Sequence, residues 1–255
     1  MTIEIRPADS SSDPGPETRV FDGFSIEFPG DAPRTARLYV DPARRKKELD
    51  AAIGAALYMA LRREARLDLH AAAVIPAPDR GAVLIVGAKG VGKSSLTLSL
   101  ALAGWRFLSD DYVLAWRGDT EVRLGCLRSS LYLTPDAVAR LPPGGPAGRN
   151  VPRMGKRMFD PGELFPGLHR VEDSLAAVVF PERVESGESS LIPIRPLEAF
   201  QRILTLTPFL AADPSARPCI EVARAIADLP SFVLRAAPDV LDPSTAARLL
   251  ERTLG

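Results

Sequence analysis

The chain has 255 residues, in which 32 Lys and Arg balance 32 Asp and Glu, so its formal charge is zero. This balance excludes a strongly basic nucleic-acid-binding protein. Apolar residues make up 46% and charged residues 25%, which is typical of a folded globular protein and excludes disorder as the default state. The longest apolar run is well short of the roughly 20 residues that cross a bilayer, so no membrane segment is expected.

The N-terminal residues lack the features of a targeting segment. Residues 1–19 are rich in Ser, Pro and acidic residues, and they contain no apolar run typical of a secretory signal. Cys126 and Cys219 are isolated from each other and from the two histidines, which suits neither a disulfide framework nor a metal cluster. We therefore expect a cytoplasmic protein with a flexible arm at residues 1–19.

Residues 20–68 are predicted to form strands and one helix that pack on the rest of the chain. Alternating apolar residues indicate antiparallel strands at 24–28 and 36–40. A helix is predicted from Pro42 to about Arg66. Its apolar stripe repeats every four residues, at Leu49, Ile53, Leu57 and Leu61.

The remaining residues, 69–255, are predicted to form an α/β domain. Apolar runs at 69–75 and 82–86 flank a stretch of turn residues and indicate paired strands, and a helix follows from Lys93 to Ala103. Further strands are expected near residues 107–108, 112–116, 122, 131, 176–180 and 232–235. Further helices are expected at 197–206, 219–228 and 243–254, and a long ordered loop or lid at 135–167.

Residues 87–94 read GAKGVGKS, which matches the phosphate-binding loop pattern GxxxxGK followed by Ser or Thr. Its glycines let backbone N–H groups face phosphate oxygens, while Lys93 meets the β- and γ-phosphates and Ser94 binds Mg²⁺. An apolar strand leads into the loop and a helix leads out, although a glycine-rich turn that caps a helix has the same context. The predicted nucleotide-binding residues are Gly87, Ala88, Lys89, Gly90, Val91, Gly92, Lys93, Ser94 and Ser95.

Three side chains are candidates for chemistry near this loop. Asp110 and Asp111 lie at the same sheet edge as the loop if the strand before them runs parallel to the strand before the loop. There they could bind a metal and orient or deprotonate a hydroxyl, although paired Asp residues are also common in turns. If the hairpin turn is centred between residues 78 and 79, paired residue numbers add to 157 and His70 lies opposite Gly87. There His70 either contacts phosphates or forms its hydrogen bonds with the backbone.

Two basic residues stand in the Pro- and Gly-rich segment 135–167. Lys156 and Arg157 would suit neutralising the charge of a transferring phosphoryl group if this segment closes over ATP. An ordinary surface loop with solvated basic residues is the alternative.

The absence of other motifs narrows the class of phosphate-loop protein. The only Asn of the chain is Asn150, so the Asn-Lys-x-Asp guanine reader of common GTPases is missing. The glycine-rich signature of transporter-type ATPases is missing as well. Small-molecule kinases and protein kinases remain.

Three segments together resemble the catalytic domain of HPr kinase/phosphorylase and its stand-alone relatives: LHAAAV at 69–74, VLIVGAKGVGKSSLTLSLALAGW at 83–105 and FLSDDYV at 107–113. The resemblance implies a P-loop kinase domain akin to HPr kinase and phosphoenolpyruvate carboxykinase, with a mixed sheet and flanking helices. It also implies ATP-dependent phosphorylation of a serine. Relatives that form rings imply a homo-oligomer.

The resemblance also implies roles for the candidate residues. Lys93 and Ser94 would handle the phosphates and magnesium, His70 would line the γ-phosphate site, and the Asp pair would supply the base and a metal ligand. The sequence does not divide the work within the pair. We take Ser94 and Asp111 as the metal ligands, and Asp110, Asp111, His70 and Lys93 as the catalytic residues.

The chain departs from the bifunctional enzymes in two places. Residues 123–133 contain no acid where those enzymes carry a Glu-containing stretch, and their N-terminal domain is not recognisable before Leu69. Recognition of HPr is thus not visible, and we expect another hydroxyl acceptor, a serine of a peptide or small protein. The hypothesis is a kinase that uses ATP and Mg²⁺. A nucleotide-binding regulatory module without phosphoryl transfer and a small-molecule hydroxyl kinase are the alternatives.

Overall fold

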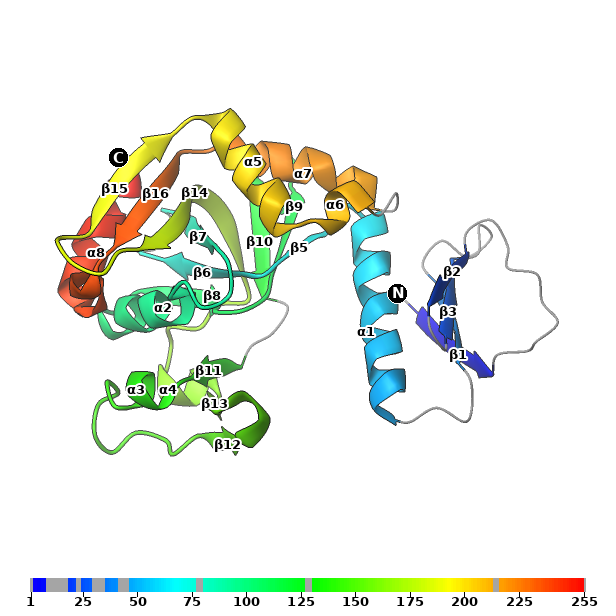
Figure 1. The fold of residues 1–255 in the computed structure, drawn as a ribbon, viewed down its shortest axis with the longest axis horizontal. Helices are drawn as coiled ribbons and strands as arrows, with labels where there is room; N and C mark the ends of the chain where they lie inside the picture. The colour runs from blue at the N-terminus through cyan, green and yellow to red at the C-terminus, as the bar shows by residue number, and fades with distance from the viewer. Residues whose placement is uncertain are drawn as a thin grey trace.

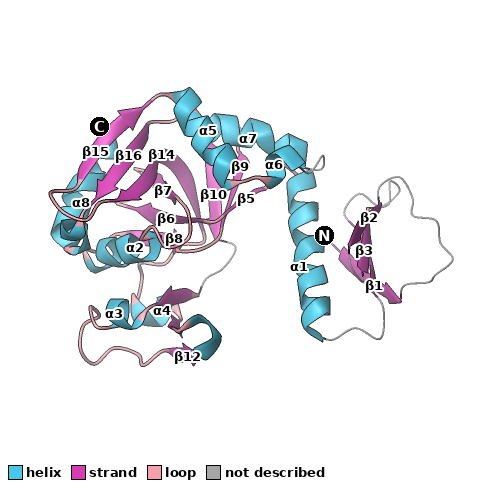
Figure 2. Ribbon diagram, viewed as in Figure 1, coloured by secondary structure: helices cyan, strands magenta, loops and turns pink. Residues whose placement is uncertain are grey.

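A computed structural model of the chain describes residues 2–7, 18–21, 24–28, 35–40, 46–76, 80–126, 130–212 and 216–254. A nine-stranded sheet carries helices on both faces, and a three-stranded sheet lies beside it (Figures 1 and 2). A four-stranded N-terminal sheet packs on a separate helix. The mixed α/β architecture with flanking helices is as predicted. Among the helices of these residues, none combines the length and hydropathy needed to cross a membrane.

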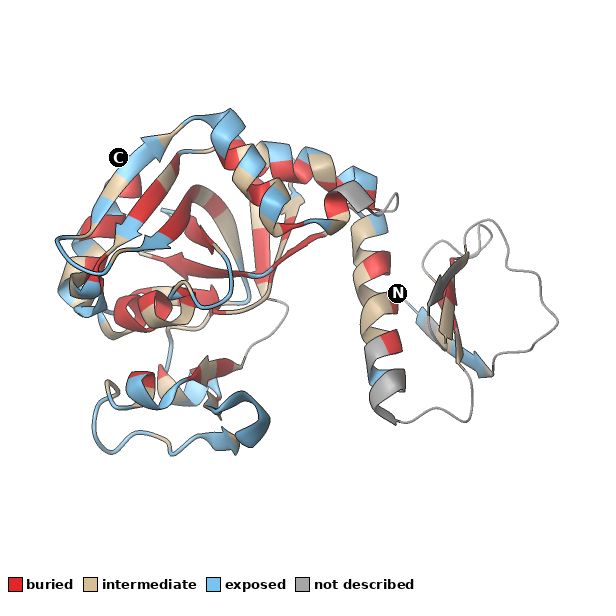
Figure 3. Ribbon diagram, in the orientation of Figure 1, coloured by how far each residue is buried: buried red, intermediate tan, exposed pale blue. Residues whose placement is uncertain are grey.

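The large sheet consists of short apolar strands with order β5-β9-β10-β14-β7-β6-β8, and β16 and β15 extend it beside the C-terminal half of β14. Every residue of β6 and β7 is buried, because helices cover both faces of the sheet (Figure 3). The strands are β5 (Leu67–Leu69), β6 (Ala71–Ile75), β7 (Ala82–Val86), β8 (Arg106–Ser109), β9 (Val113–Arg117), β10 (Val122–Cys126), β14 (Glu172–Arg183), β15 (Ser190–Ile194) and β16 (Ser231–Ala236).

The hairpin of β6 and β7 fixes the geometry of the phosphate loop. Ala71 pairs with Val86, which is the predicted register, so His70 lies at the level of Gly87. Strand β6 also pairs antiparallel with β8, so β7 and β8 run in the same direction with β6 between them. Both therefore end at one edge of the sheet, as predicted. The apolar run 69–75 is not one strand, however: it breaks at His70, and β5 pairs with β9 instead.

Helices bury apolar stripes on the two faces of the large sheet (Figure 1). One face is covered by α5 (Pro196–Leu206), α6 (Phe209–Ala212) and α7 (Arg217–Ala227). The other is covered by α2 (Lys93–Leu102), η3 (Pro238–Leu241), α8 (Pro243–Glu251) and η4 (Arg252–Leu254). Helix α2 is buried on several sides, as its leucines predict, and Gly104 follows it with a φ of 88°.

The segment expected as a long ordered loop or lid, residues 135–167, instead folds into a small unit with the strand predicted near residue 131. It contains β11 (Leu131–Leu133), α3 (Pro135–Val138), β12 (Arg149–Val151), η1 (Pro152–Met154), β13 (Lys156–Phe159) and α4 (Pro161–Leu164). Its sheet has the order β11-β13-β12. Leu131, Leu133 and Phe159 are buried in the same apolar cluster as Leu96 of α2, so the unit packs against the helix that follows the phosphate loop.

The N-terminal unit packs a sheet of order β1-β4-β3-β2 on α1 (Lys46–Arg63). Its strands are β1 (Thr2–Pro7), β2 (Thr18–Phe21), β3 (Phe24–Glu27) and β4 (Thr35–Val40). The prediction of a flexible arm is therefore wrong for the residues of β1 and β2, because both pair with neighbouring strands. Residues 8–17 and the predicted helix start at 42–45 lie outside the described residues. Tyr39 donates to Glu27 over 2.8 Å on this sheet.

One ion pair fastens α1 to the large sheet. The Arg62 guanidinium donates to both carboxylate oxygens of Asp68 in β5, at 2.7 and 2.9 Å. Its central carbon also lies 3.6 Å from the ring centroid of Phe209 in α6. Both charged side chains are largely buried, at 14% and 9% exposure, so water screens the pair little.

Asp68→Ala is expected to lower the free energy of unfolding by about 3 kcal/mol, because it removes the carboxylate that accepts two hydrogen bonds from the largely buried Arg62 guanidinium. Urea denaturation measures the loss. Glu198→Ala is the matched control: it breaks an exposed pair with Arg202, and we expect it to cost less than about 1 kcal/mol. Equal losses of unfolding free energy in the two variants would contradict the conclusion that the pair of Arg62 and Asp68 holds α1 on the large sheet.

Candidate functional site

The predicted phosphate loop, residues 87–94, connects the end of β7 to the start of α2. Gly90 and Gly92 adopt φ values of 89° and 103°, which residues with a Cβ rarely adopt. Gly92 is the N-cap of α2 and brings no side chain to cap it. The N–H groups of the first helical turn and the helix dipole therefore favour an anion at this point. All nine predicted residues, 87–95, lie in this loop and first turn.

Lys93 is held inside the loop. Its side chain is 5% exposed, and its amine donates to the carbonyl oxygens of Gly87 at 2.7 Å and Ala88 at 3.2 Å. Burial lowers the pKa of Lys93 to about 8, although the negative charges of Asp111 and Asp110 oppose this shift. The amine thus remains mostly protonated at neutral pH and presents a cation to the mouth of the loop.

Asp110 is a buried carboxyl at the end of β8. Only 4% of the residue is exposed, and the Ser94 side chain and the Tyr132 backbone hydrogen-bond the carboxyl. Its Oδ1 is buried with no hydrogen-bond partner within the described part of the chain. Burial raises the pKa of Asp110 to about 6, and the charge of Asp111 adds to this effect. A buried anionic oxygen without a partner is costly and favours a nearby cation.

Asp111 has a different environment. Its Oδ1 lies 3.6 Å from Nε2 of His70. The backbone N–H groups of Asp111 and Tyr112 donate to Ser109 Oγ at 3.3 and 3.2 Å, which fixes the turn after β8. Burial, and then the charge of Lys93, lower the pKa of His70 below its ordinary 6.5. The imidazole beside Asp111 is therefore neutral at pH 7.

These side chains share one cleft of about 640 Å³. The structure brings together all of the predicted catalytic residues, the phosphate loop and Lys156 of β13. Arg157 is not part of the cleft, since successive side chains of a strand point to opposite faces, and its guanidinium donates instead to the Ala147 carbonyl at 3.1 Å. The lining residues that the sequence did not single out are Tyr112, Tyr132, Thr134 and Met154.

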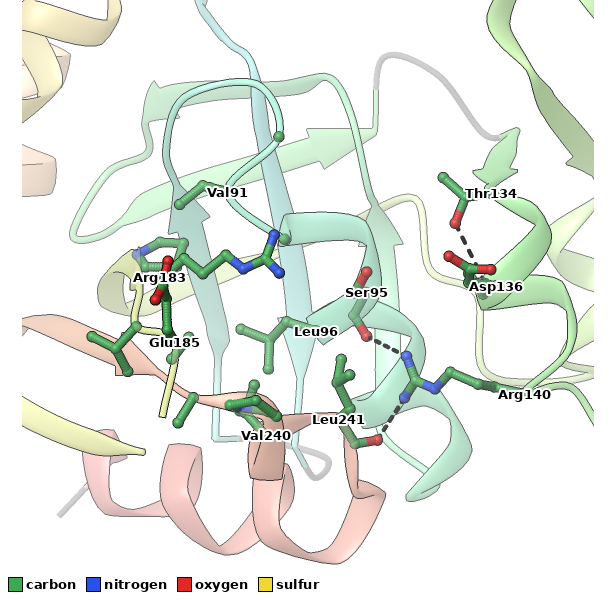
Figure 4. A pocket seen from close by; sticks show the side chains of 18 residues that line it. Val91, Ser95, Leu96, Thr134, Asp136, Arg140, Arg183, Glu185, Val240 and Leu241 are labelled. Atoms are coloured by element: carbon green, nitrogen blue, oxygen red, sulfur yellow. Dashed lines mark hydrogen bonds between the residues drawn. The ribbon is translucent and has the colours of Figure 1, made fainter. Parts of the chain in front are cut away.

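A second cavity, of about 610 Å³ (Figure 4), has lining residues of the loop in common with this cleft. The two share Gly90, Gly92, Ser95 and Thr134. Beyond the loop, apolar side chains of α2 and η3 line the second cavity, together with the charged residues Asp136, Arg140, Arg183 and Glu185. Arg140 lies on its rim and donates to Ser99 Oγ and the Leu241 carbonyl, each at 2.6 Å, so uncharged oxygens hold its guanidinium.

The donor set in the cleft fits a magnesium ion. Ser94 and Asp110 supply a hydroxyl and a carboxylate, and Mg²⁺ prefers oxygen ligands. No group of three or more His, Cys, Asp or Glu side chains is gathered for a metal among the described residues. A cation here would therefore complete its shell with phosphate oxygens and water, as Mg²⁺ commonly does. The sequence predicted Ser94 with Asp111 as the metal pair; both line the cleft, and the Ser94 side chain also interacts with Asp110.

Asp110→Asn is expected to change the pH dependence of stability in the ligand-free protein. Because burial raises the folded-state pKa from 3.8 to about 6, the unfolded chain ionises Asp110 first as pH rises. The wild type thus loses about 1–3 kcal/mol relative to the variant between about pH 4 and 6, and the difference stays constant above that range. Urea unfolding across this range measures the difference. A difference that does not vary with pH would contradict the buried carboxylate.

Comparison with known proteins adds one structural similarity. No family model matches the chain, and no curated protein matches its sequence. Among solved structures, the chain is similar to the HPr(Ser) kinase/phosphatase from Coxiella burnetii, with 13% sequence identity and a TM-score of 0.45. The similarity covers 73% of this chain and 89% of that chain. A similarity this low assigns no activity, so the function of the site has to be inferred from its own residues and contacts.

Proposed function

We propose that the chain is a kinase that transfers the γ-phosphoryl group of ATP to a hydroxyl, with a serine of a peptide or small protein as the acceptor. The observation that supports this proposal most directly is that one cleft contains the predicted phosphate loop and two carboxylates in different environments. Asp110 is buried against Ser94, and Asp111 faces a histidine. Phosphoryl transfer needs one carboxylate for the metal and one for the acceptor, and these environments supply both.

The phosphate side of the cleft is formed by the loop and by two lysines. Backbone N–H groups of the loop and the Lys93 amine would hold the β- and γ-phosphates. Ser94 and Asp110 would hold Mg²⁺, which neutralises phosphate charge when bound. Lys156 lines the same cleft from the small sheet and lies close enough to Lys93 and Asp110 to affect their pKa values.

The acceptor side is formed by Asp111 and His70. The acceptor oxygen would bond to the γ-phosphorus while the bond from that phosphorus to the β–γ bridging oxygen breaks, and ADP leaves with that electron pair. The hydroxyl proton passes to Asp111. Neutral His70, 3.6 Å from the Asp111 carboxylate, would orient this group without competing for its charge.

The second cavity suits the nucleoside. It opens from Ser95 and Leu96, on the side of the loop where the first turn of α2 continues away from Lys93. The apolar side chains of Leu96, Val240 and Leu241 in this cavity suit the faces of a nucleobase. Arg140 would add a positive charge near the α-phosphate, because its guanidinium is held against uncharged oxygens rather than a carboxylate.

The kinase assay follows label from γ-labelled ATP to serine-containing peptides. Lys93→Met is expected to lower kcat/KM by about 10²–10³, and Lys156→Met by about tenfold or more, because each removes a cation from the developing charge. Arg157→Met is the control on the same strand and is expected to change the rate by less than about twofold, since its side chain lies outside the cleft. Bound nucleotide without labelled product in the wild type would favour a regulatory module.

Leu241→Ala tests the nucleoside assignment. This side chain lines the second cavity and is 42% exposed, so its removal spares the core. Loss of its apolar contact is expected to weaken ATP binding about three- to tenfold. Affinity for inorganic tripolyphosphate should not change, because that ligand has no nucleoside. Calorimetric titration compares the two ligands, and parallel changes in both affinities would refute the assignment.

A further inference from the structure

A row of aromatic side chains leads from the reacting end of the cleft to the N-terminal unit. The Tyr112 ring meets His70 edge-to-face, with centroids 5.6 Å apart and an interplanar angle of 63°. Tyr58 of α1 follows, with its centroid 6.2 Å from that of Tyr112. The row therefore joins His70, which contacts Asp111, to a helix outside the kinase core.

The row is held at a fixed place relative to Asp111. Tyr112 is the next residue in the chain, and the same Ser109 hydroxyl accepts hydrogen bonds from both backbone N–H groups. Tyr58 is one turn before Arg62, whose pairing with Asp68 fastens α1 to β5. These contacts give both rings a set distance from the acceptor side of the cleft.

The row of aromatic side chains presents an apolar surface to a bound ligand rather than a net charge. Arg62 lies at its far end, with its central carbon 5.9 Å from the Tyr58 centroid, but Asp68 neutralises its charge. Tyr58 and Tyr112 are only partly buried. Met154 of η1 lines the cleft together with Tyr112 and is 48% exposed. Tyrosine and methionine surfaces of this kind favour aromatic and large apolar side chains.

The length of the row distinguishes a polymer from a small molecule. An extended peptide rises about 3.3 Å per residue, so the two centroid-to-centroid steps of 5.6 and 6.2 Å from His70 to Tyr58 span at most about four residues. A small hydroxy metabolite at Asp111 would not reach Tyr58. We propose that the acceptor is a polypeptide with an aromatic or large apolar residue within about four positions of the serine, which packs on Tyr112 and Tyr58. This inference rests on the proposed kinase function, and it makes α1 part of acceptor recognition.

The experiment uses the full chain, γ-labelled ATP, Mg²⁺ and a degenerate peptide library with one central serine, followed by sequencing of the phosphopeptides. We expect aromatic or large apolar residues to be enriched at least about fivefold at one flanking position, which corresponds to about 1 kcal/mol of selectivity. Tyr58→Ala should abolish this enrichment and leave ATP affinity within about twofold. Tyr39→Ala, on the N-terminal sheet, is the matched control and should retain it.

Tyr58→Glu adds a test that misfolding cannot imitate, because it should shift the preference at the same position toward Lys and Arg. Enrichment that persists in Tyr58→Ala, phosphopeptides without any aromatic or apolar preference, or labelling of free serine but not of peptides would overturn the inference and leave a kinase. Failure of the proposed function is distinct: the wild type would then label no acceptor at all.

Discussion

The site depends on the burial of one carboxyl, Asp110, against the first turn of α2. Taking a carboxylate out of water is costly, and the chain offsets this cost with the Ser94 side chain, the nearby charge of Lys156 and the Tyr132 backbone. Because Tyr132 belongs to β11, the same carboxyl links the small sheet to the phosphate loop. Asp110 Oδ1, which has no hydrogen-bond partner among the described residues, marks where a bound cation would complete the centre. Buried polar atoms without a hydrogen-bond partner are concentrated at functional sites.

Local patterns predicted the part of the fold that carries the phosphate loop. The turn-rich stretch between two apolar runs gave the register of β6 and β7, since a hairpin is set by its own loop. The leucines after Lys93 gave a helix buried on several sides, and Gly104 gave its end. The common direction of β7 and β8, and hence the placement of the Asp pair beside the loop, followed from the handedness of the crossover.

The rest of the site is set by contacts between segments far apart in the chain. His70 lies in a strand break that exists because β5 pairs with β9, and no local pattern records that pairing. The small sheet pairs the predicted strand β11 with β13, which lies in a segment rich in Pro and Gly and therefore resembled a loop in sequence. Only this pairing shows that Lys156, and not Arg157, enters the cleft. Asp110 and Asp111 also differ in how deeply they are buried. The sequence cannot show this difference, because the two residues are adjacent and of the same type.

A structure of the chain with Mg²⁺ and a non-hydrolysable ATP analogue tests the central claim most directly. We expect the γ-phosphate to lie between the Lys93 amine and Asp111, and the cation to bind Ser94 and Asp110 Oδ1. We expect the nucleoside to lie in the second cavity. A nucleotide bound away from the loop, or a cation held without Asp110, would contradict this claim.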